Sequence, residues 1–83
     1  MRIRIDDDTY EGSPADIIDD LREQSFHKDD FPNTESFLRH MRNNFTRLTD
    51  MPCELPEGNA DVRAKAMLER LAEVDALEIL ESD

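Results

Sequence analysis

The sequence predicts a small α+β domain of two layers, in which an N-terminal β-hairpin and a C-terminal strand pack against three helices (ββαααβ). Three observations lead to this fold class. The segments near both ends alternate apolar and polar residues, which is the pattern of a half-buried strand. The three longer segments between them repeat apolar residues at helical spacing. Each of these longer segments also follows a residue that commonly caps a helix.

A two-stranded hairpin is marginal by itself, so we expect the C-terminal strand to join it and form one sheet. The three helices would then cover one face of that sheet. With 83 residues the chain fits a single domain, residues 1–83. Its core is expected to be small, because short chains bury a smaller fraction of their surface.

The first two strands are expected at residues 2–5 and 8–11, with a turn of aspartates between them. Alternation in the first strand places Ile3 and Ile5 on the buried face of the sheet. The arginines of this strand then lie on the open face, where glutamates of neighbouring strands can pair with them. The expected partners of Arg2 and Arg4 are Glu11 and Glu78.

The first helix is expected at residues 14–25. Ser13 can cap it, and Pro14 fits the first helical position. Asp16 is favoured near the N-terminal end of the helix, because the helix dipole is positive there.

The second helix, residues 34–49, has the most regular apolar pattern of the chain, and Asn33 or Thr34 can cap it. Its expected buried stripe consists of Phe37, Leu38, Met41, Phe45 and Leu48. A loop with two prolines and a glycine follows, in which Leu55 is expected to anchor the chain in the core.

The third helix, residues 60–74, follows Asn59 as its cap. The last strand is expected at residues 77–80, with Leu77 and Ile79 turned toward the core.

The chain carries 21 Asp and Glu against 10 Lys and Arg, a formal net charge of −11. This charge opposes nonspecific binding to nucleic acid or anionic lipid, and it favours a protein partner with a basic surface. Solubility alone also explains an acidic composition. The candidate partner-binding surface consists of the acids of the hairpin and the first helix: Asp6, Asp7, Asp8, Glu11, Asp16, Asp19, Asp20 and Glu23.

From this acidic surface we expect a non-enzymatic binding protein that engages the basic surface of a nucleic-acid-binding protein. Its carboxylates would take the place of nucleic-acid phosphates. Small inhibitors and regulators of phages and mobile elements often have such a composition, and the analogy rests on composition alone. The association is expected to be fast at low salt and to weaken as salt is added.

A first alternative is a homo-oligomeric or adapter domain, such as a homodimer. Its contact would use exposed apolar residues such as Phe26, Phe31, Met51 and Leu80. The edge of the sheet could also add a strand from a partner.

A second alternative is a nucleic-acid binder that uses a basic face of the helix at 34–49, formed by Arg39, Arg42 and Arg47. Arginine and asparagine side chains read base edges. The long loop after this helix and the acids of the next helix argue against a DNA-reading helix pair. We therefore favour ion pairs of these arginines with Glu35, Asp50 or acids of the other two helices.

No motif for catalysis, for a cofactor or for a metal site is present, and we expect no enzyme activity. His27, His40 and Cys53 are the only soft metal ligands, and their spacing does not fit a structural zinc site. The single cysteine, together with the lack of a signal-like or membrane-spanning apolar run, indicates a soluble cytoplasmic protein.

Overall fold

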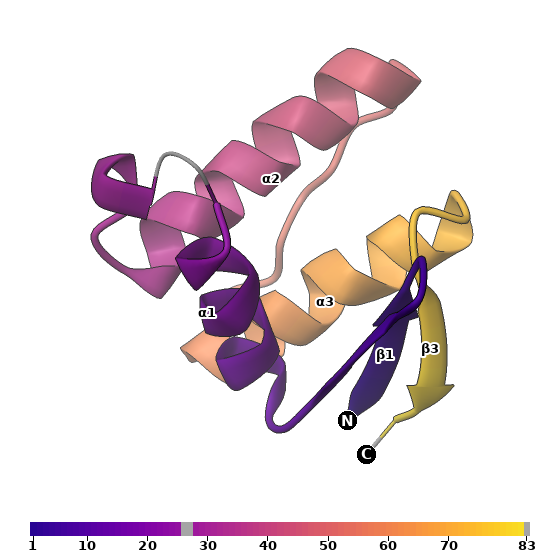
Figure 1. Cartoon of the computed structure of the whole chain (residues 1–83). Helices are drawn as coiled ribbons and strands as arrows, with labels where there is room; N and C mark the ends of the chain where they lie inside the picture. Colours follow the sequence, from indigo (N-terminus) through magenta and orange to yellow (C-terminus); the bar gives the residue numbers. More distant parts are fainter. Residues whose placement is uncertain (26–27, 83) are drawn as a thin grey trace.

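The computed structural model describes residues 1–25 and 28–82, and its elements follow the order ββαααβ (Figure 1). The predicted α+β fold class is confirmed. Three antiparallel strands form one sheet in the order β2-β1-β3. Helices α1 and α3 contact this sheet and each other, and α2 packs against both of them. The N-terminal strand therefore lies at the centre of the sheet, beside the C-terminal strand.

The hairpin consists of β1 (Arg2–Ile5) and β2 (Asp8–Glu11), as expected. The register pairs Ile3 with Tyr10 on the face that packs against the helices. On the open face Arg2 lies 3.4 Å from Glu11 and 3.6 Å from Glu81, and Arg4 pairs with Glu78. The predicted cross-strand ion pairs are thus confirmed, and Glu81 adds one that was not predicted.

Helix α1 (Pro14–Glu23) begins as expected, with the Ser13 hydroxyl accepting a hydrogen bond from the Asp16 amide at 3.2 Å. It ends two residues earlier than the predicted 14–25. The Ser25 amide donates to the carbonyl oxygen of Arg22, three residues back, so the last turn tightens beyond the helix. The Tyr10 hydroxyl donates to the Gln24 side chain at 3.0 Å and holds this end of α1 against β2.

Helix α2 (Thr34–Thr49) follows a short 3₁₀ turn, η1 (Lys28–Asp30), and has the predicted bounds. Asn33 and Ser36 form a reciprocal capping box, in which each side chain bonds the backbone of the other. This arrangement satisfies two amide groups that a helix start would otherwise leave without partners.

Helix α3 (Ala60–Glu73) is capped by the Asn59 side chain, which accepts a hydrogen bond from the Val62 amide at 3.0 Å. At its C-terminal end the amide groups of Asp75 and Ala76 donate to the carbonyl oxygens of Ala72 and Leu71, which is the Schellman pattern. This turn sends the chain into β3 (Glu78–Glu81). The strand starts one residue later than the predicted 77–80, because Leu77 still belongs to the turn and is buried there.

The core joins residues of the central strand, all three helices and the loop after α2. Its buried members are Met1, Ile3, Ile17, Ile18, Phe37, Leu38, Phe45, Cys53, Ala64, Met67, Leu68 and Leu77. Leu55 is partly buried against them, as predicted for the loop anchor. Leu48, however, is 81% exposed, so the expectation that it belongs to the buried stripe of α2 is wrong. Figure 1 shows α2 and α3 diverging toward their C-terminal ends, so Leu48 borders an open hollow with Leu71 and Val74 instead of packing against them.

Three aspartates have left-handed backbone conformations, and the one in the hairpin turn, Asp6, has a φ of 55°. Glycine adopts this conformation without steric cost, and hairpin turns of two residues favour it there. We expect Asp6→Gly to raise the free energy of unfolding by up to about 1 kcal/mol. Urea unfolding measures this change. Asp7→Gly is the control, because the φ of Asp7 is not positive and the glycine should not stabilise the turn.

Candidate functional site

The solvent side of α1 carries acidic residues at helical spacing. Asp16, Asp20 and Glu23 are exposed and occupy positions i, i+4 and i+7, so they lie along one face of the helix. We call these three residues the α1 acidic face. Ile17 and Ile18 are fully buried on the opposite side. The helix is therefore held by its apolar side and presents its carboxylates to solvent.

Two of the three carboxylates on this face have no cationic partner among the residues that the structure describes. Asp16 and Asp20 form no side-chain ion pair with any other residue in the described ranges, whereas Glu23 lies 3.7 Å from Arg22. Exposed pairs of this kind contribute little to stability, so folding does not require these acids to be neutralised. The charge of the face thus stays available to a partner.

Asp19, another acid of the predicted partner-binding surface, contacts two residues of the domain. Its side chain is 37% exposed, lies 3.4 Å from Arg22 and accepts a hydrogen bond from the Thr34 hydroxyl at 2.7 Å. This contact joins α1 to the start of α2. Arg22 also donates to the Phe31 carbonyl oxygen at 3.0 Å and so fixes the chain between the two helices.

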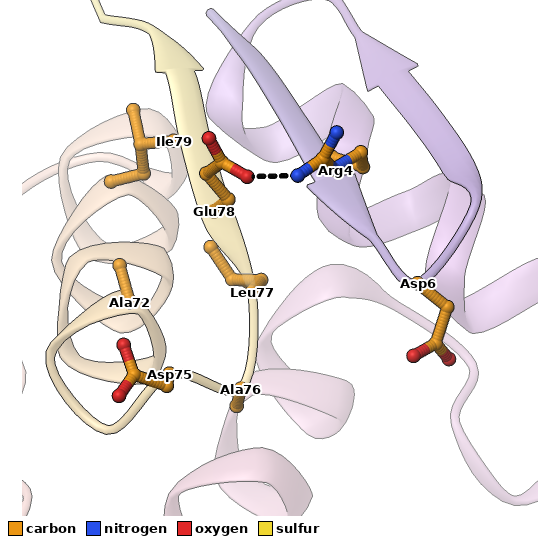
Figure 2. A pocket seen from close by; sticks show the side chains of 8 residues that line it. All are labelled: Arg4, Asp6, Ala72, Asp75, Ala76, Leu77, Glu78 and Ile79. Carbon is orange, nitrogen blue, oxygen red and sulfur yellow. Dashed lines mark hydrogen bonds and ion pairs between the residues drawn. The ribbon is translucent and has the colours of Figure 1, made fainter.

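The structure separates the remaining acids of the predicted surface from the α1 acidic face. Glu11 lies on the open face of the sheet and pairs with Arg2. The hairpin turn with Asp6, Asp7 and Asp8 lies at the other end of β2, away from α1 (Figure 1). Figure 2 shows Asp6 beside a shallow pocket near the turn between α3 and β3.

That pocket has a volume of about 590 Å³ and is lined by Arg4 and Asp6 of the hairpin, Ala72 of α3 and the segment Asp75–Ile79 (Figure 2). Arg4 and Glu78 form an ion pair there. Glu78 is paired with Arg4, and Figure 2 shows Asp6 at the hairpin turn well apart from Asp75 at the turn after α3, so the carboxylates do not converge on one point. Among residues 1–25 and 28–82, no group of three or more His, Cys, Asp or Glu side chains is placed to hold a metal ion.

Two acids that the sequence did not single out adjoin the α1 acidic face. Asp61, in the first turn of α3, accepts a hydrogen bond from the Ala15 amide at 3.0 Å and so lies at the N-terminal end of α1. At the other end, Asp29 and Glu23 line a pocket of about 340 Å³. No signal in the sequence could have placed Asp61 here, because 46 residues separate it from Ala15.

The basic face of α2 differs from what the sequence predicted. Glu35 pairs with Arg63 of α3 at 3.0 Å and with none of the arginines of α2. Arg47 donates to the Asn44 side chain at 2.6 Å, while Arg39 and Arg42 form no hydrogen bond or ion pair within the described part of the chain. The expected neutralisation of these arginines by Glu35, Asp50 or acids of α1 and α3 is therefore wrong. Nucleic-acid binding by this face stays a prediction.

The apolar residues expected on the surface have different environments. Phe31 is partly buried, with its ring centroid 5.2 Å from that of Phe37 and 4.6 Å from that of His40. It is therefore part of the packing, and the expectation that it forms an exposed contact is wrong. Met51 and Leu80 are 39% and 43% exposed. Phe26 and His27 lie outside the described residues.

Cys53 and His40, the two soft metal-ligand candidates within the described residues, lie in different environments. Cys53 is buried, and its thiol lies 4.0 Å from the Met67 sulfur. His40 bonds the Asn44 side chain at 3.1 Å on the surface of α2.

In the described part of the chain, no helix has both the length and the apolar character that a membrane span requires.

The fold and its surface define a small α+β domain with a charged helix face. No protein-family model matches the chain, and no curated protein or solved structure matches it significantly.

Proposed function

We propose that this protein acts by binding, and that the α1 acidic face docks against the basic surface of a partner protein. The observation that carries the proposal is the row of exposed carboxylates at 16, 20 and 23, two of which have no ion pair in the described part of the chain. Asp61 and Asp29 extend the negative charge beyond both ends of the helix. A partner that binds nucleic acid would offer a suitable basic surface, with carboxylates in place of phosphates.

The mechanism rests on long-range attraction followed by short contacts. A net charge of −11 draws a basic protein toward the chain, which raises the association rate at low salt. Once docked, lysines and arginines of the partner can pair with Asp16 and Asp20, which form no ion pair within the described residues. Added salt screens this attraction, so the complex should dissociate as ionic strength rises.

The test compares two triple variants that lose the same charge. The first, Asp16→Asn/Asp20→Asn/Glu23→Gln, neutralises the α1 acidic face. The control, Glu54→Gln/Glu57→Gln/Glu69→Gln, neutralises three other exposed acids that form no ion pair within the described residues. Each variant and the unchanged protein serve as bait for a lysate at low salt, and a salt gradient elutes the bound proteins for mass spectrometry.

We expect a basic protein that the unchanged chain and the control retain and that the first variant loses. Its affinity for the first variant should fall by at least about tenfold, because the charges closest to the partner are gone. Equal loss with both variants would show that net charge alone drives capture, and the proposed face would then be wrong. Retention by the first variant would also contradict the proposal.

A further inference from the structure

The solvent side of α2 carries the basic face that the sequence indicated, formed by Arg39, Arg42 and Arg47. Arg39 and Arg47 are exposed, and Arg42 is half-buried. Arg39 and Arg42 lie about one helical turn apart and form no hydrogen bond or ion pair within the described residues. Arg47 is bonded to the uncharged side chain of Asn44 at 2.6 Å. Among the described residues, no acid pairs with any of the three cations of this face.

Most other arginines of the chain, which has 21 Asp and Glu for 10 Lys and Arg, pair with a carboxylate. The arginines that form such ion pairs are Arg2, Arg4, Arg22, Arg63 and Arg70. Within α2, the sequence contains no Asp or Glu from Ser36 to Thr49, and the carboxylate of Glu35 is paired with α3. The packing of the domain therefore leaves a locally positive surface on an acidic protein.

This surface is open to a large partner, because α2 lies on the outside of the domain and packs against α1 and α3 by its inner side (Figure 1). Asn43 and Thr46 are exposed beside the arginines and supply uncharged hydrogen-bond donors. Leu48, an exposed apolar residue of α2, lies about 180° around the helix from Arg39. The basic face thus carries arginine, asparagine and threonine, without an apolar or aromatic side chain.

We infer that the basic face of α2 binds the phosphate backbone of duplex DNA. Arginine can donate two parallel hydrogen bonds to one phosphate, and asparagine and threonine side chains also donate to phosphate oxygens. Protein surfaces that bind DNA are more polar and more positively charged than interfaces between proteins, whose centres contain apolar anchors. A cationic face without an apolar anchor therefore suits phosphates better than it suits an acidic protein.

The chemistry and shape of the face favour duplex DNA over other nucleic acids. Single strands are held by bases that stack on aromatic side chains, which this face does not contain. The major groove of B-form DNA admits an α-helix, whereas the major groove of an RNA duplex is too narrow for side chains to read. The inference needs α2 alone, so the long loop before α3, which argues against a pair of reading helices, does not oppose it.

The remaining charge of the chain limits this binding and orients it. A net charge of −11 repels DNA, so an approach through α2 is favoured because it brings cations to the phosphates first. We expect weak binding, with a dissociation constant of about 100 µM or more at low salt. The inference goes beyond the proposed function, since it uses a different helix and requires no protein partner.

An NMR titration of the ¹⁵N-labelled full chain tests the inference, with a mixed-sequence DNA duplex of about 15 base pairs as the probe. At about 0.05 M NaCl we expect chemical-shift changes centred on the amide groups of residues 36–49. Raising NaCl to about 0.2 M should weaken the affinity by roughly ten- to fortyfold, as expected for two to three phosphate contacts. An RNA duplex of the same sequence and poly-glutamate should both bind more weakly than the DNA.

Two double variants that lose the same charge separate the basic face from net charge. Arg39→Gln/Arg42→Gln should lower the affinity for DNA by at least about tenfold and reduce its dependence on salt. The matched control, Arg2→Gln/Arg4→Gln, removes two cations from the open face of the sheet and should retain the shift changes in α2. Far-UV circular dichroism verifies that both variants remain folded.

The inference is overturned if DNA changes no amide shift in α2 at low salt, or if the two double variants lose affinity equally. Binding of poly-glutamate as tight as that of DNA would overturn it in favour of an acidic protein partner, and equal binding of the RNA duplex would overturn the choice of DNA. The variant that neutralises the α1 acidic face should bind DNA at least as well as the unchanged chain does, so this inference and the proposed function can fail separately.

Discussion

Replacing Leu38 with alanine is expected to lower the free energy of unfolding by about 2–5 kcal/mol. Leu38 is fully buried in α2, the helix that packs against both α1 and α3. The substitution removes apolar contacts and leaves a cavity that the surrounding helices fill only in part. A domain of this size has a total stability of about 4–12 kcal/mol, so the loss is a large share of it.

The matched control is Leu48→Ala, which makes the same chemical change ten residues further along the same helix. Because Leu48 is 81% exposed, we expect a change within about 0.5 kcal/mol. Urea unfolding measures the free energy of unfolding of both variants. Equal losses for the two variants would contradict the packing of α2 described above.

Replacing Arg22 with alanine is expected to cost about 1–3 kcal/mol of folding free energy. The Arg22 side chain is 20% exposed, and its guanidinium lies near Asp19 and Glu23 and donates to the Phe31 carbonyl oxygen. Its removal leaves this carbonyl without its donor and leaves two neighbouring carboxylates without their cation. A half-buried polar group that loses its partner costs more than an exposed ion pair contributes.

Arg39→Ala serves as the control for this prediction. It removes the same charge from the surface, but Arg39 forms no hydrogen bond or ion pair with another described residue. The free energy of unfolding should therefore change by no more than about 0.5 kcal/mol. If the two variants had the same free energy of unfolding, the contacts of Arg22 between α1 and the start of α2 would not contribute to stability, and the prediction would be wrong.

Much of the architecture follows from short segments of sequence. The caps at Ser13, Asn33 and Asn59 set the starts of the three helices, because a side-chain oxygen next to free amide groups acts locally. Alternation in the first strand likewise determines which of its side chains face the helices. The end of the first helix differs from the predicted residue 25, because α1 stops at Glu23, where its last turn tightens.

The α1 acidic face could also be predicted, since the positions of Asp16, Asp20 and Glu23 on one side of a helix follow from helical spacing. The separation of this face from the acids of the hairpin turn could not be predicted from the sequence. That separation depends on the direction in which α1 leaves the sheet, and no residue near the turn encodes it in a recognisable pattern.

The sequence by itself determined the elements, their order and the side of each helix that carries charge, because these depend on neighbours within about one helical turn. Only the tertiary structure decided that Glu35 pairs with Arg63, that Asp61 lies at the start of α1 and that Leu48 stays exposed. Each of these three findings concerns a contact, present or absent, between residues that are distant in the chain. Such contacts depend on the directions in which the helices pack against one another, and this is a property of the packed domain.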